Sequence, residues 1–463
     1  MEFCKPGFLA FFVPFLIVYW TLRSHGSRMG WLLLGSAIYY ALFNPWFILL
    51  MLASTSIDYI VALRLPSVTS PANRRWLVAL CIATNLGILA YFKYLLFAVT
   101  TASMVSGWLG SPFDAPVWKV VLPLGISFYT FEAISYVVDV YRGSIRPFRS
   151  PRDYLLYILF FPHLLAGPIV RSGDFAHQLH RPKRFSWARF EVGVRLFLVG
   201  AFKKAVLADW MATIVDPVFN DPAGYGTAAL WTATLGYSVQ IYGDFSGYSD
   251  MAIGIAHMLG FKLPDNFRTP YLSASIAEFW RRWHISLSSW LRDYLYIPLG
   301  GSRGGEWLTC RNLMITMALG GLWHGASWTF VLWGVFHGAL LAAGRIVPVP
   351  SWAKASWTRP GWVILTFVAV SIGWVLFRAQ TFAQAATVLN GLVVPISGRS
   401  LPREQVVMVL AGLAAVFVGG AVDIRKILLR LPEPVAAAGL AAFALVYFLL
   451  LPLSASGFIY FNF

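Results

Sequence analysis

Charged residues are scarce in this chain: Asp, Glu, Lys and Arg together make up 12% of its 463 residues. Soluble globular proteins keep roughly a quarter of their residues charged, so this scarcity excludes an ordinary soluble enzyme. Hydrophobic residues make up 58% and recur in long blocks, without the alternation expected of strands in a membrane β-barrel. The sequence therefore predicts an all-α polytopic membrane protein.

Cysteine is also rare. Cys4, Cys81 and Cys310 stand far apart in the sequence and form no CxxC pair, which argues against a disulfide framework. The chain also lacks HExxH, GxSxG, Walker and dinucleotide-binding motifs, so the chemistries that these motifs indicate have no support. We expect no metal site and no permanently bound cofactor.

Acidic residues are outnumbered, 20 against 36 Lys and Arg, and the formal net charge is +16. The basic residues do not form a stripe or tail of the kind that binds nucleic acid. They collect in four loops, as the positive-inside rule describes for cytoplasmic loops. We expect contacts with membrane lipids, no nucleic-acid partner, and an amino terminus outside. The four loops are 23–28, 64–75, 142–152 and 171–189.

Apolar blocks that could cross a membrane recur along the whole chain, and a crossing helix needs roughly 20 residues. Two central blocks are short, so we expect about 11 or 12 spans. We treat 1–463 as a single integral domain, with peripheral helices over about 1–118, a catalytic core over about 119–345 and carboxyl-terminal helices over about 346–463. The blocks are 7–22, 29–43, 46–63, 76–97, 119–141, 190–212, 227–257, 312–323, 326–344, 361–378, 406–423 and 434–453.

Two segments fit neither a span nor a free loop. Segment 153–170 is apolar, but basic loops flank it on both sides, so both of its ends should face the cytoplasm. A re-entrant element explains this, because irregular backbone is tolerated at membrane depth where other helices cover it. Segment 264–311 is rich in Trp, Arg and Tyr, and we expect it to form interfacial or re-entrant helices on the cytoplasmic side.

Two of the eight histidines stand in surroundings that suggest chemistry. His324 lies in the apolar stretch GGLWHGASW, where glycines weaken the helix and would let the backbone open toward a cavity. An ionisable group at membrane depth is costly and is first interpreted as functional. A ring bonded to a neighbouring carbonyl is the structural alternative. His284 lies in WRRWH, which suits interfacial anchoring or recognition of an anionic donor.

A histidine in a dry channel can act as a general base toward a hydroxyl group. Exclusion of water would protect an activated acyl thioester from hydrolysis. Several acidic residues also lie in apolar surroundings, and their structural alternative is pairing with a buried base. The sequence does not explain why Lys203 and Lys204 stand in the middle of a predicted span. Weaker candidates for donor binding or channel lining are Trp280, Arg281, Arg282, Trp323, Asp244, Ser246 and Tyr248.

Several longer stretches resemble the membrane-bound O-acyltransferase (MBOAT) family, in particular its bacterial branch that includes the membrane subunit for alginate O-acetylation. The block around WRRWHISLS, followed by LWHGASW, is the most specific part. The stretches are GISFYTFEAISYVVDVYRG (125–143), FFPHLLAGPIVR (160–171), QIYGDFSGYSDMAIGIAHMLGFKLPDNF (240–267), FWRRWHISLSSWLRDYLYIPLGG (279–301), GGLWHGASW (320–328) and FIYFNF (458–463).

The resemblance implies a ring of helices around a thinned central core, with a channel that crosses the membrane at the histidines. It implies that His324 is the embedded catalytic histidine and that His284 is its partner near the cytoplasmic entrance. Gly243 departs from the bulkier residue expected in the family pattern, which would alter the width of the channel. The terminal FNF replaces a more usual FQF.

We therefore predict a membrane O-acyltransferase of the bacterial inner membrane that moves an acetyl group to a hydroxyl of an exported or cell-wall polysaccharide. The donor substrate would be acetyl-CoA or another cytoplasmic thioester. Transfer would be direct or would pass through a periplasmic partner enzyme of the SGNH type. Two alternatives stay open: D-alanyl transfer to teichoic acid from a carrier protein, and a transporter or flippase without catalysis. General-base and acyl-histidine roles for His324 also stay open.

Overall fold

The computed structural model describes residues 3–111, 113–114, 120–165, 167–347 and 355–422, with a few positions between 432 and 442. Within these ranges the chain is built from helices and has no strand; Tyr225 and Arg399 form an isolated β-bridge. The all-α prediction is confirmed. The chain divides into two compact units, Met1–Phe190 with Leu259–Leu263, and Glu191–Met258 with Pro264–Phe463. The prediction of one domain over 1–463 is not tested by this division.

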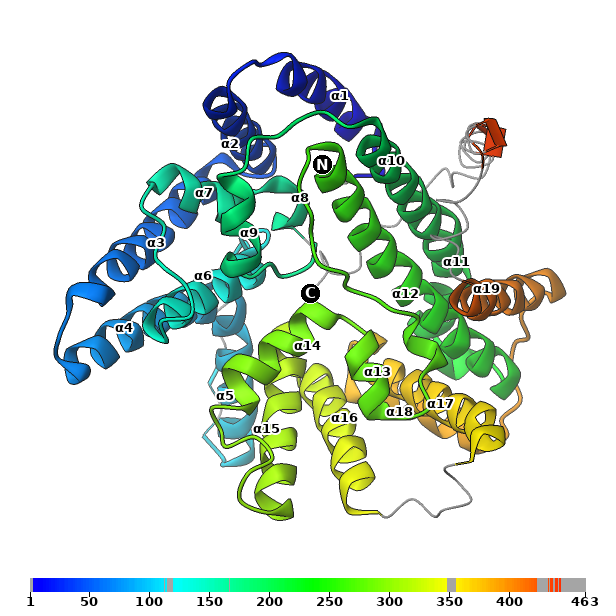
Figure 1. The fold of residues 1–463 in the computed structure, drawn as a ribbon. Coiled ribbons are helices and arrows are strands. Elements are labelled where there is room, and N and C mark those ends of the chain that lie inside the picture. Colours follow the sequence, from blue (N-terminus) through cyan, green and yellow to red (C-terminus); the bar gives the residue numbers. More distant parts are fainter. Residues whose placement is uncertain are drawn as a thin grey trace. The chain divides into compact units, whose positions relative to one another are not determined.

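The first unit consists of helices α1 to α9 (Figure 1). Four of these helices begin with proline at their first position, where a backbone N–H is not needed. The side chains of Asn44 and Ser70 cap two of them by accepting backbone N–H groups. The bounds are α1 Pro6–Thr21, α2 His25–Ala41, α3 Pro45–Arg64, α4 Pro71–Leu89, α5 Leu95–Trp108, α6 Ile126–Tyr141, α7 Pro151–Leu159, α8 Phe161–Leu164 and α9 Ser172–Leu179.

The second unit contains α11 to α19 and nearly all of α10, which begins at Trp187 (Figure 1). Two turns of π-helix interrupt it, η3 at Lys203–Ala208 and η6 at Arg292–Tyr296. The bounds are α10 Trp187–Phe202, α11 Asp209–Asn220, α12 Thr227–Met258, α13 Ile276–Arg282, α14 Ile285–Leu291, α15 Glu306–His324, α16 Trp328–Ile346, α17 Arg359–Arg378, α18 Phe382–Val393 and α19 Arg403–Ala421.

Five helical stretches of the described residues are long and apolar enough to cross a membrane, which supports the multi-pass prediction. The apolar block at 434–453 falls mostly outside the described residues, as does FIYFNF at 458–463. Helix α18 was not predicted. The five stretches are Pro45–Ser67, Pro71–Trp108, Trp328–Ile346, Ser356–Arg378 and Arg403–Ala421.

One predicted loop is wrong. The predicted spans 76–97 and 119–141 leave residues 98–118 as a connection, but α4, the π-helical turn Ala90–Tyr94 and α5 form one continuous helical stretch that ends at Trp108. Nothing in LFAVTTASMVSGW stops a helix before Gly107, since the stretch contains no proline and its polar residues are small.

The segment predicted to be re-entrant, 153–170, consists of the two short helices α7 and α8, broken at Phe160 and almost entirely buried. Glu132 of α6 holds the irregular part that follows. Its Oε1 accepts the Val170 N–H at 2.9 Å and lies 3.1 Å from Nδ1 of His163. The broken helix matches the expected form, because a neighbouring helix supplies the partners that irregular backbone needs at membrane depth.

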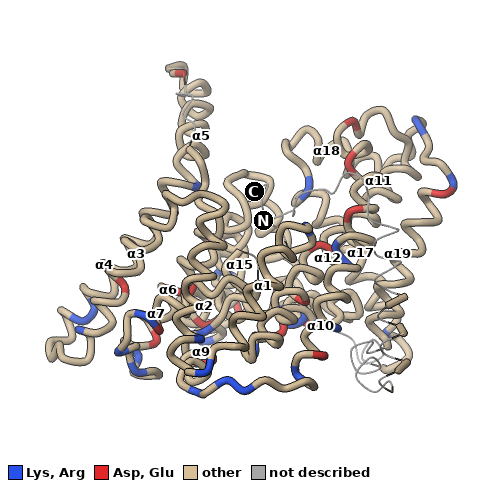
Figure 2. The backbone as a smooth tube through the Cα atoms, turned by 90° about the horizontal axis from the view of Figure 1, so that it is seen from above, with Lys and Arg blue, Asp and Glu red and all other residues tan. Residues whose placement is uncertain are grey.

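Basic residues gather where the sequence analysis expected them. In Figure 2 blue stretches of the tube mark the chain around α7 and α9, where residues 142–152 and 171–189 lie, and the chain beside α4; further blue stretches lie in the region of α18 and α19. Loop charge of this kind sets orientation under the positive-inside rule, so these loops carry the topology signal.

Helices α10 and α12 approach closely through two reciprocal pairs of glycines. A Cβ on Gly193 would lie 2.6 Å from the Gly254 carbonyl oxygen, and one on Gly254 would lie 2.5 Å from the Gly193 oxygen. Gly200 and Gly247 repeat the arrangement at 2.4 and 2.6 Å. Small residues let helix backbones touch in a membrane, where dispersion replaces the hydrophobic driving force. The glycines of the QIYGDFSGYSD region therefore serve packing.

The mid-span lysines are paired with the acids of α12. Lys204 Nζ lies 2.7 Å from Asp244 and 2.8 Å from Asp209, and Lys203 Nζ lies 2.7 Å from Asp250. The π-helical turn η3 carries both lysines. A buried charge is tolerated when it is paired and hydrogen-bonded, so these residues form an internal ion network between η3, α11 and α12.

Helices α15 and α16 form a tight hairpin around GGLWHGASW. Helix α15 continues through Gly320 and Gly321 to its last residue, His324, so the prediction that these two glycines loosen the helix is wrong. Gly325 follows as the C-cap residue, with extended backbone. A Cβ on Gly321 would lie 2.2 Å from the Phe330 carbonyl oxygen, and one on Gly334 would lie 2.2 Å from the Met317 oxygen. The glycines bring the two backbones together and fix the helix that ends at His324.

Gly321→Ala should destabilise the protein, because the added methyl group overlaps a backbone oxygen that cannot rotate away. We expect a loss of about 1–3 kcal/mol in unfolding free energy, measured as a lower thermal melting temperature in detergent. Gly344→Ala is the matched control, since a Cβ there meets no heavy atom within 4 Å. Equal melting temperatures for the two variants would contradict the packing argument.

Candidate functional site

His284 occupies the junction between α13 and α14, where it is the N-cap residue of α14. Its backbone is left-handed, with φ +42° and ψ +54°, a conformation that is uncommon for residues other than glycine. The side chain is fully buried, at 0% exposure. Strained backbone of this kind persists when the surroundings determine it, and it is concentrated at functional sites.

Asn266 determines the position of His284. Its Oδ1 lies 3.1 Å from Nδ1 of His284 and accepts the backbone N–H and the hydroxyl of Ser286 at 3.2 and 2.9 Å. Its backbone oxygen accepts the Ile285 N–H at 2.9 Å, and its Nδ2 donates to Ser249 of α12 at 3.2 Å. One buried amide therefore connects the histidine, the first turn of α14 and α12.

These bonds also fix the tautomer of His284. The Ser286 backbone N–H can only donate, so the atom that accepts it must be the amide oxygen of Asn266. That oxygen cannot donate to the imidazole, and Nδ1 of His284 must therefore carry the proton. Nε2 is left with its lone pair, and it has no hydrogen-bond partner among the described residues. It is the atom available to accept a proton.

Burial lowers the pKa of His284 to about 3, because a charged imidazolium is poorly solvated in apolar surroundings. The histidine lies in the connection between α12 and α15, outside the candidate membrane-spanning stretches. At neutral pH the ring is therefore neutral. A neutral imidazole with a defined tautomer can accept a proton without first having to lose one. It can also polarise a substrate carbonyl through a group that it binds.

His324 is the last residue of α15 and is 3% exposed. The centroid of its ring lies 6.3 Å from that of His284, with the planes inclined at 58°. Ring centroids of Trp323, Trp333 and Phe377 lie 5.0, 5.2 and 5.3 Å from it. The two histidines predicted as a pair, 40 positions apart in the sequence, are thus near neighbours within one aromatic enclosure.

A third histidine, His337, extends this enclosure along α16. Its ring lies 5.0 Å from Trp333 and 5.2 Å from Trp280, and Trp333 also contacts His324. Within the part of the chain that the structure describes, both ring nitrogens of His337 and the indole Nε1 atoms of Trp280 and Trp333 have no hydrogen-bond partner. Buried polar atoms are rarely left without a hydrogen bond, so these atoms are available to form hydrogen bonds with a polar group that enters the enclosure.

The weaker donor-binding candidates on α13 and α15 differ in their surroundings. Trp280 and Trp323 belong to the aromatic enclosure, at 5.2 Å from His337 and 6.1 Å from His284 respectively. Arg282 is engaged by Glu278 at 2.7 Å and by Thr269 at 3.1 Å, which gives it a structural role. Arg281 is exposed and has the freedom to contact a donor that Arg282 lacks.

The candidates on α12 are all buried. Asp244 pairs with Lys204, which supports the structural alternative for this acid. Ser246 has a buried hydroxyl without a partner among the described residues, and Tyr248 is 1% exposed. Gly243 lies against the backbone of η3, with Lys203 O 3.0 Å from the position of a Cβ. The missing side chain would therefore face a neighbouring helix, so the expected effect of Gly243 on channel width has no support here.

Two residues that the sequence analysis did not select are parts of this site, Asn266 and His337. Asn266 stands in LPDNF, 18 positions before His284, and only the fold brings its amide to the imidazole. His337 follows Trp333 by four positions, and that spacing places both side chains on one face of a helix. This spacing could have identified it.

No group of three or more His, Cys, Asp or Glu residues in the described part of the chain could hold a metal ion. The histidines are surrounded by aromatic rings and an amide, whereas a zinc site uses three or four nitrogen, sulfur or carboxylate ligands. The geometry suits proton transfer to or from a neutral imidazole in a site that excludes water.

Comparison with known proteins gives a consistent result. A probable alginate O-acetylase of Azotobacter vinelandii is 43% identical over 82% of this chain and 75% of its own length. A peptidoglycan O-acetyltransferase of Helicobacter pylori is 36% identical over 84% of this chain and 79% of its own. A teichoic acid D-alanyltransferase of Bacillus subtilis is 28% identical over 58% of this chain and 71% of its own.

The family model for membrane-bound O-acyltransferases matches residues 149–392. This range contains His284, His324, His337 and Asn266, which is the whole of the site described above. With the similarity to the acetylating relatives over most of the chain, the match shows that the chain belongs to the membrane-bound O-acyltransferase family and is a multi-pass membrane acyltransferase.

Proposed function

We propose that this protein transfers an acetyl group from a cytoplasmic thioester, with acetyl-CoA as the donor, to a hydroxyl of an exported or cell-wall polysaccharide. The observation that carries the proposal is the pair of buried imidazoles, whose ring centroids lie 6.3 Å apart. In His284 the tautomer is defined, and Nε2 is the nitrogen with the lone pair. The acetylating relatives, one named for alginate and one for peptidoglycan, support a polysaccharide acceptor.

The chemistry proposed for His324 is general-base catalysis. Its ring nitrogen accepts the proton of the acceptor hydroxyl as the hydroxyl oxygen attacks the thioester carbonyl carbon. The C–O bond forms, the C–S bond breaks, and the departing thiolate takes the proton from the imidazolium. The carbonyl end of α15 lies beside the ring, and a helix carboxyl terminus favours the positive charge that forms in this step.

His284 acts as the second group of the same site. Its proton on Nδ1 is held by Asn266, so Nε2 can accept a hydrogen bond from the acceptor hydroxyl or from the incoming donor amide. The aromatic walls formed by Trp323, Trp333 and Phe377 exclude water, which matters because a thioester is otherwise lost to hydrolysis. Asn266 is a positioning residue in this scheme.

The proposal also includes orientation and partners. We infer an inner-membrane location with the amino terminus outside, because the loops rich in Lys and Arg belong on the cytoplasmic side. We further infer a periplasmic acetyltransferase partner of the SGNH type that completes esterification. D-alanyl transfer is less well supported, since the D-alanyltransferase relative matches only 58% of the chain at 28% identity.

Purified protein in nanodiscs, given radiolabelled acetyl-CoA, a polysaccharide acceptor and the periplasmic partner, should transfer label to the polysaccharide. Acceptor-bound radioactivity after removal of free donor is the measurement. D-alanyl carrier protein serves as the competing donor. Label that stays on acetyl-CoA in every combination, while the D-alanyl group is transferred, would replace the acetyl proposal. Uptake of the polysaccharide into the membrane fraction without transfer would favour a transporter.

His324→Ala should lower acetyl transfer by about 10²–10⁴-fold, the range that a lost general base costs. Melting temperature should remain close to that of the unmodified protein. His257→Gln, in the last turn of α12, is the matched control and should keep full activity. Full activity of His324→Ala would refute the catalytic role, and a collapsed fold would return the ring to a packing role.

Asn266→Asp should move the acid limb of the pH–rate profile to higher pH. The new carboxylate beside Nδ1 favours the imidazolium, so it raises the pKa of His284 from about 3. The neutral form is then lost at a higher pH than before, and activity recovers once the pH exceeds the raised pKa. Asn266→Ala should lose activity at every pH. An unshifted profile in Asn266→Asp would show that activity does not require the neutral form of His284.

A further inference from the structure

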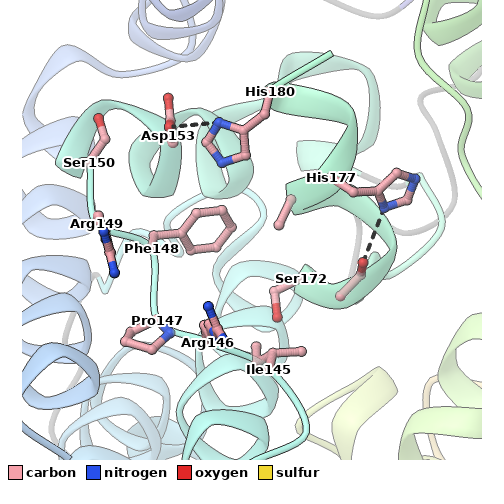
Figure 3. A pocket seen from close by; sticks show the side chains of 12 residues that line it. Ile145, Arg146, Pro147, Phe148, Arg149, Ser150, Asp153, Ser172, His177 and His180 are labelled. Carbon is pink, nitrogen blue, oxygen red and sulfur yellow. Dashed lines mark hydrogen bonds and ion pairs between the residues drawn. The ribbon is translucent and has the colours of Figure 1, made fainter. Parts of the chain in front are cut away.

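A second polar site lies in the first unit. In the sequence, its residues are well separated from the elements that carry the histidine pair. It is a pocket of about 480 Å³ between the connection that precedes α7 and the beginning of α9 (Figure 3). The function proposed above does not use it. Its polar lining residues are Arg146, Arg149, Asp153, Ser172, His177 and His180.

The lining is predominantly basic. Arg146 and Arg149 come from the loop 142–152, His177 comes from α9, and His180 is the C-cap residue that follows α9. Both arginines and both histidines are exposed, so their charged or polar ends are accessible to a ligand. Guanidinium groups present paired N–H donors that match the oxygens of a phosphate. The loops also belong to the set that the positive-inside rule assigns to the cytoplasmic side.

Ser172 supplies the independent sign of a ligand. It lines the pocket, is only 1% exposed, and its hydroxyl has no hydrogen-bond partner among the described residues. A buried hydroxyl that is left unsatisfied costs about 1–3 kcal/mol, so such a group is normally provided with a partner. Figure 3 shows Ser172 beside Arg146 and Phe148 around the same space.

Two helices begin at this pocket. Ser150 is the N-cap residue of α7, and Ser172 and Gly173 are the first residues of α9; all three line the pocket. The first backbone N–H groups of a helix have no intrahelical partner and favour an anion.

One acidic side chain faces the same pocket, and its charge is already balanced. Asp153 is 5% exposed and lies 3.2 Å from Arg152 and 3.8 Å from His180. His177 contacts the Gly173 carbonyl oxygen through Nδ1 at 3.3 Å. The two arginines and the Ser172 hydroxyl are therefore the groups left to meet a ligand.

We propose that this pocket binds a phosphate group, with Arg146 and Arg149 as the charged contacts and the Ser172 hydroxyl as the buried one. The space exceeds one phosphate, so it also admits the group to which the phosphate is attached. A phospholipid headgroup and a soluble phosphorylated molecule present the same chemistry, and the experiment below separates these two sources. The binding does not depend on acetyl transfer.

The test uses the full chain, purified in phosphate-free detergent, and measures binding by isothermal titration calorimetry. The probes are inorganic phosphate, adenosine 3′,5′-bisphosphate and dihexanoyl phosphatidylglycerol. Arg146→Gln and Ser172→Ala should each weaken binding by about tenfold or more, the usual effect of losing one charge-assisted or buried hydrogen bond. Arg184→Gln, an exposed arginine of the same loop region outside the pocket, should stay within about twofold of the unmodified protein.

The outcomes are distinct. Tighter binding of phosphatidylglycerol, lost in both pocket variants, assigns a lipid headgroup, whereas tighter binding of the bisphosphate assigns a soluble ligand. Ser172→Ala removes one oxygen atom and should melt at the same temperature as the unmodified protein, so its effect cannot come from unfolding. Absence of binding for all three probes, or equal binding in Arg146→Gln and the unmodified protein, would overturn the proposal.

Discussion

The requirement that a buried polar group find a partner governs this structure more than any other. In an apolar environment an unpaired charge or amide is costly. The chain nevertheless places lysines, acids and histidines at buried positions of largely apolar helices. Lys204 is acceptable because Asp209 and Asp244 lie within 2.8 Å of its Nζ. The reciprocal glycine pairs bring α10 and α12 close enough for partners on separate elements to meet.

Two buried histidines show how the same requirement separates a structural from a functional residue. His163 has both ring nitrogens engaged, Nδ1 by Glu132 and Nε2 by the Tyr157 carbonyl oxygen, each at 3.1 Å. His284 has only Nδ1 engaged, by Asn266. The first ring completes the packing of the broken α7–α8 segment. The second ring keeps Nε2 at a fixed position without a hydrogen-bond partner among the described residues, as the proposed acyl transfer requires.

The sequence predicted the structural features that depend on periodicity and composition. The helix class, the multi-pass character, the broken segment at 153–170 and the proximity of His284 to His324 could all be inferred, the last through family resemblance. Glycines were misjudged at 320 and 321, because propensity considers one helix at a time and close packing involves two. The contribution of Asn266 could not be inferred, since its three contacts with His284 and Ser286 exist only after the connection between α12 and α13 has folded back.

The left-handed backbone of His284 shows where the preorganisation of the site resides. A non-glycine residue in this conformation costs about 1–3 kcal/mol, and two short hydrogen-bonded links oppose that cost. The Arg268 N–H donates to the Arg282 oxygen and the Ile285 N–H donates to the Asn266 oxygen, both at 2.9 Å. The bend therefore forms with the fold and precedes substrate binding. Because the same segment holds the backbone and, through the Asn266 amide, the ring, the direction of Nε2 is set by the protein before a donor arrives. In the proposed reaction the barrier then does not have to include the free energy of orienting this imidazole.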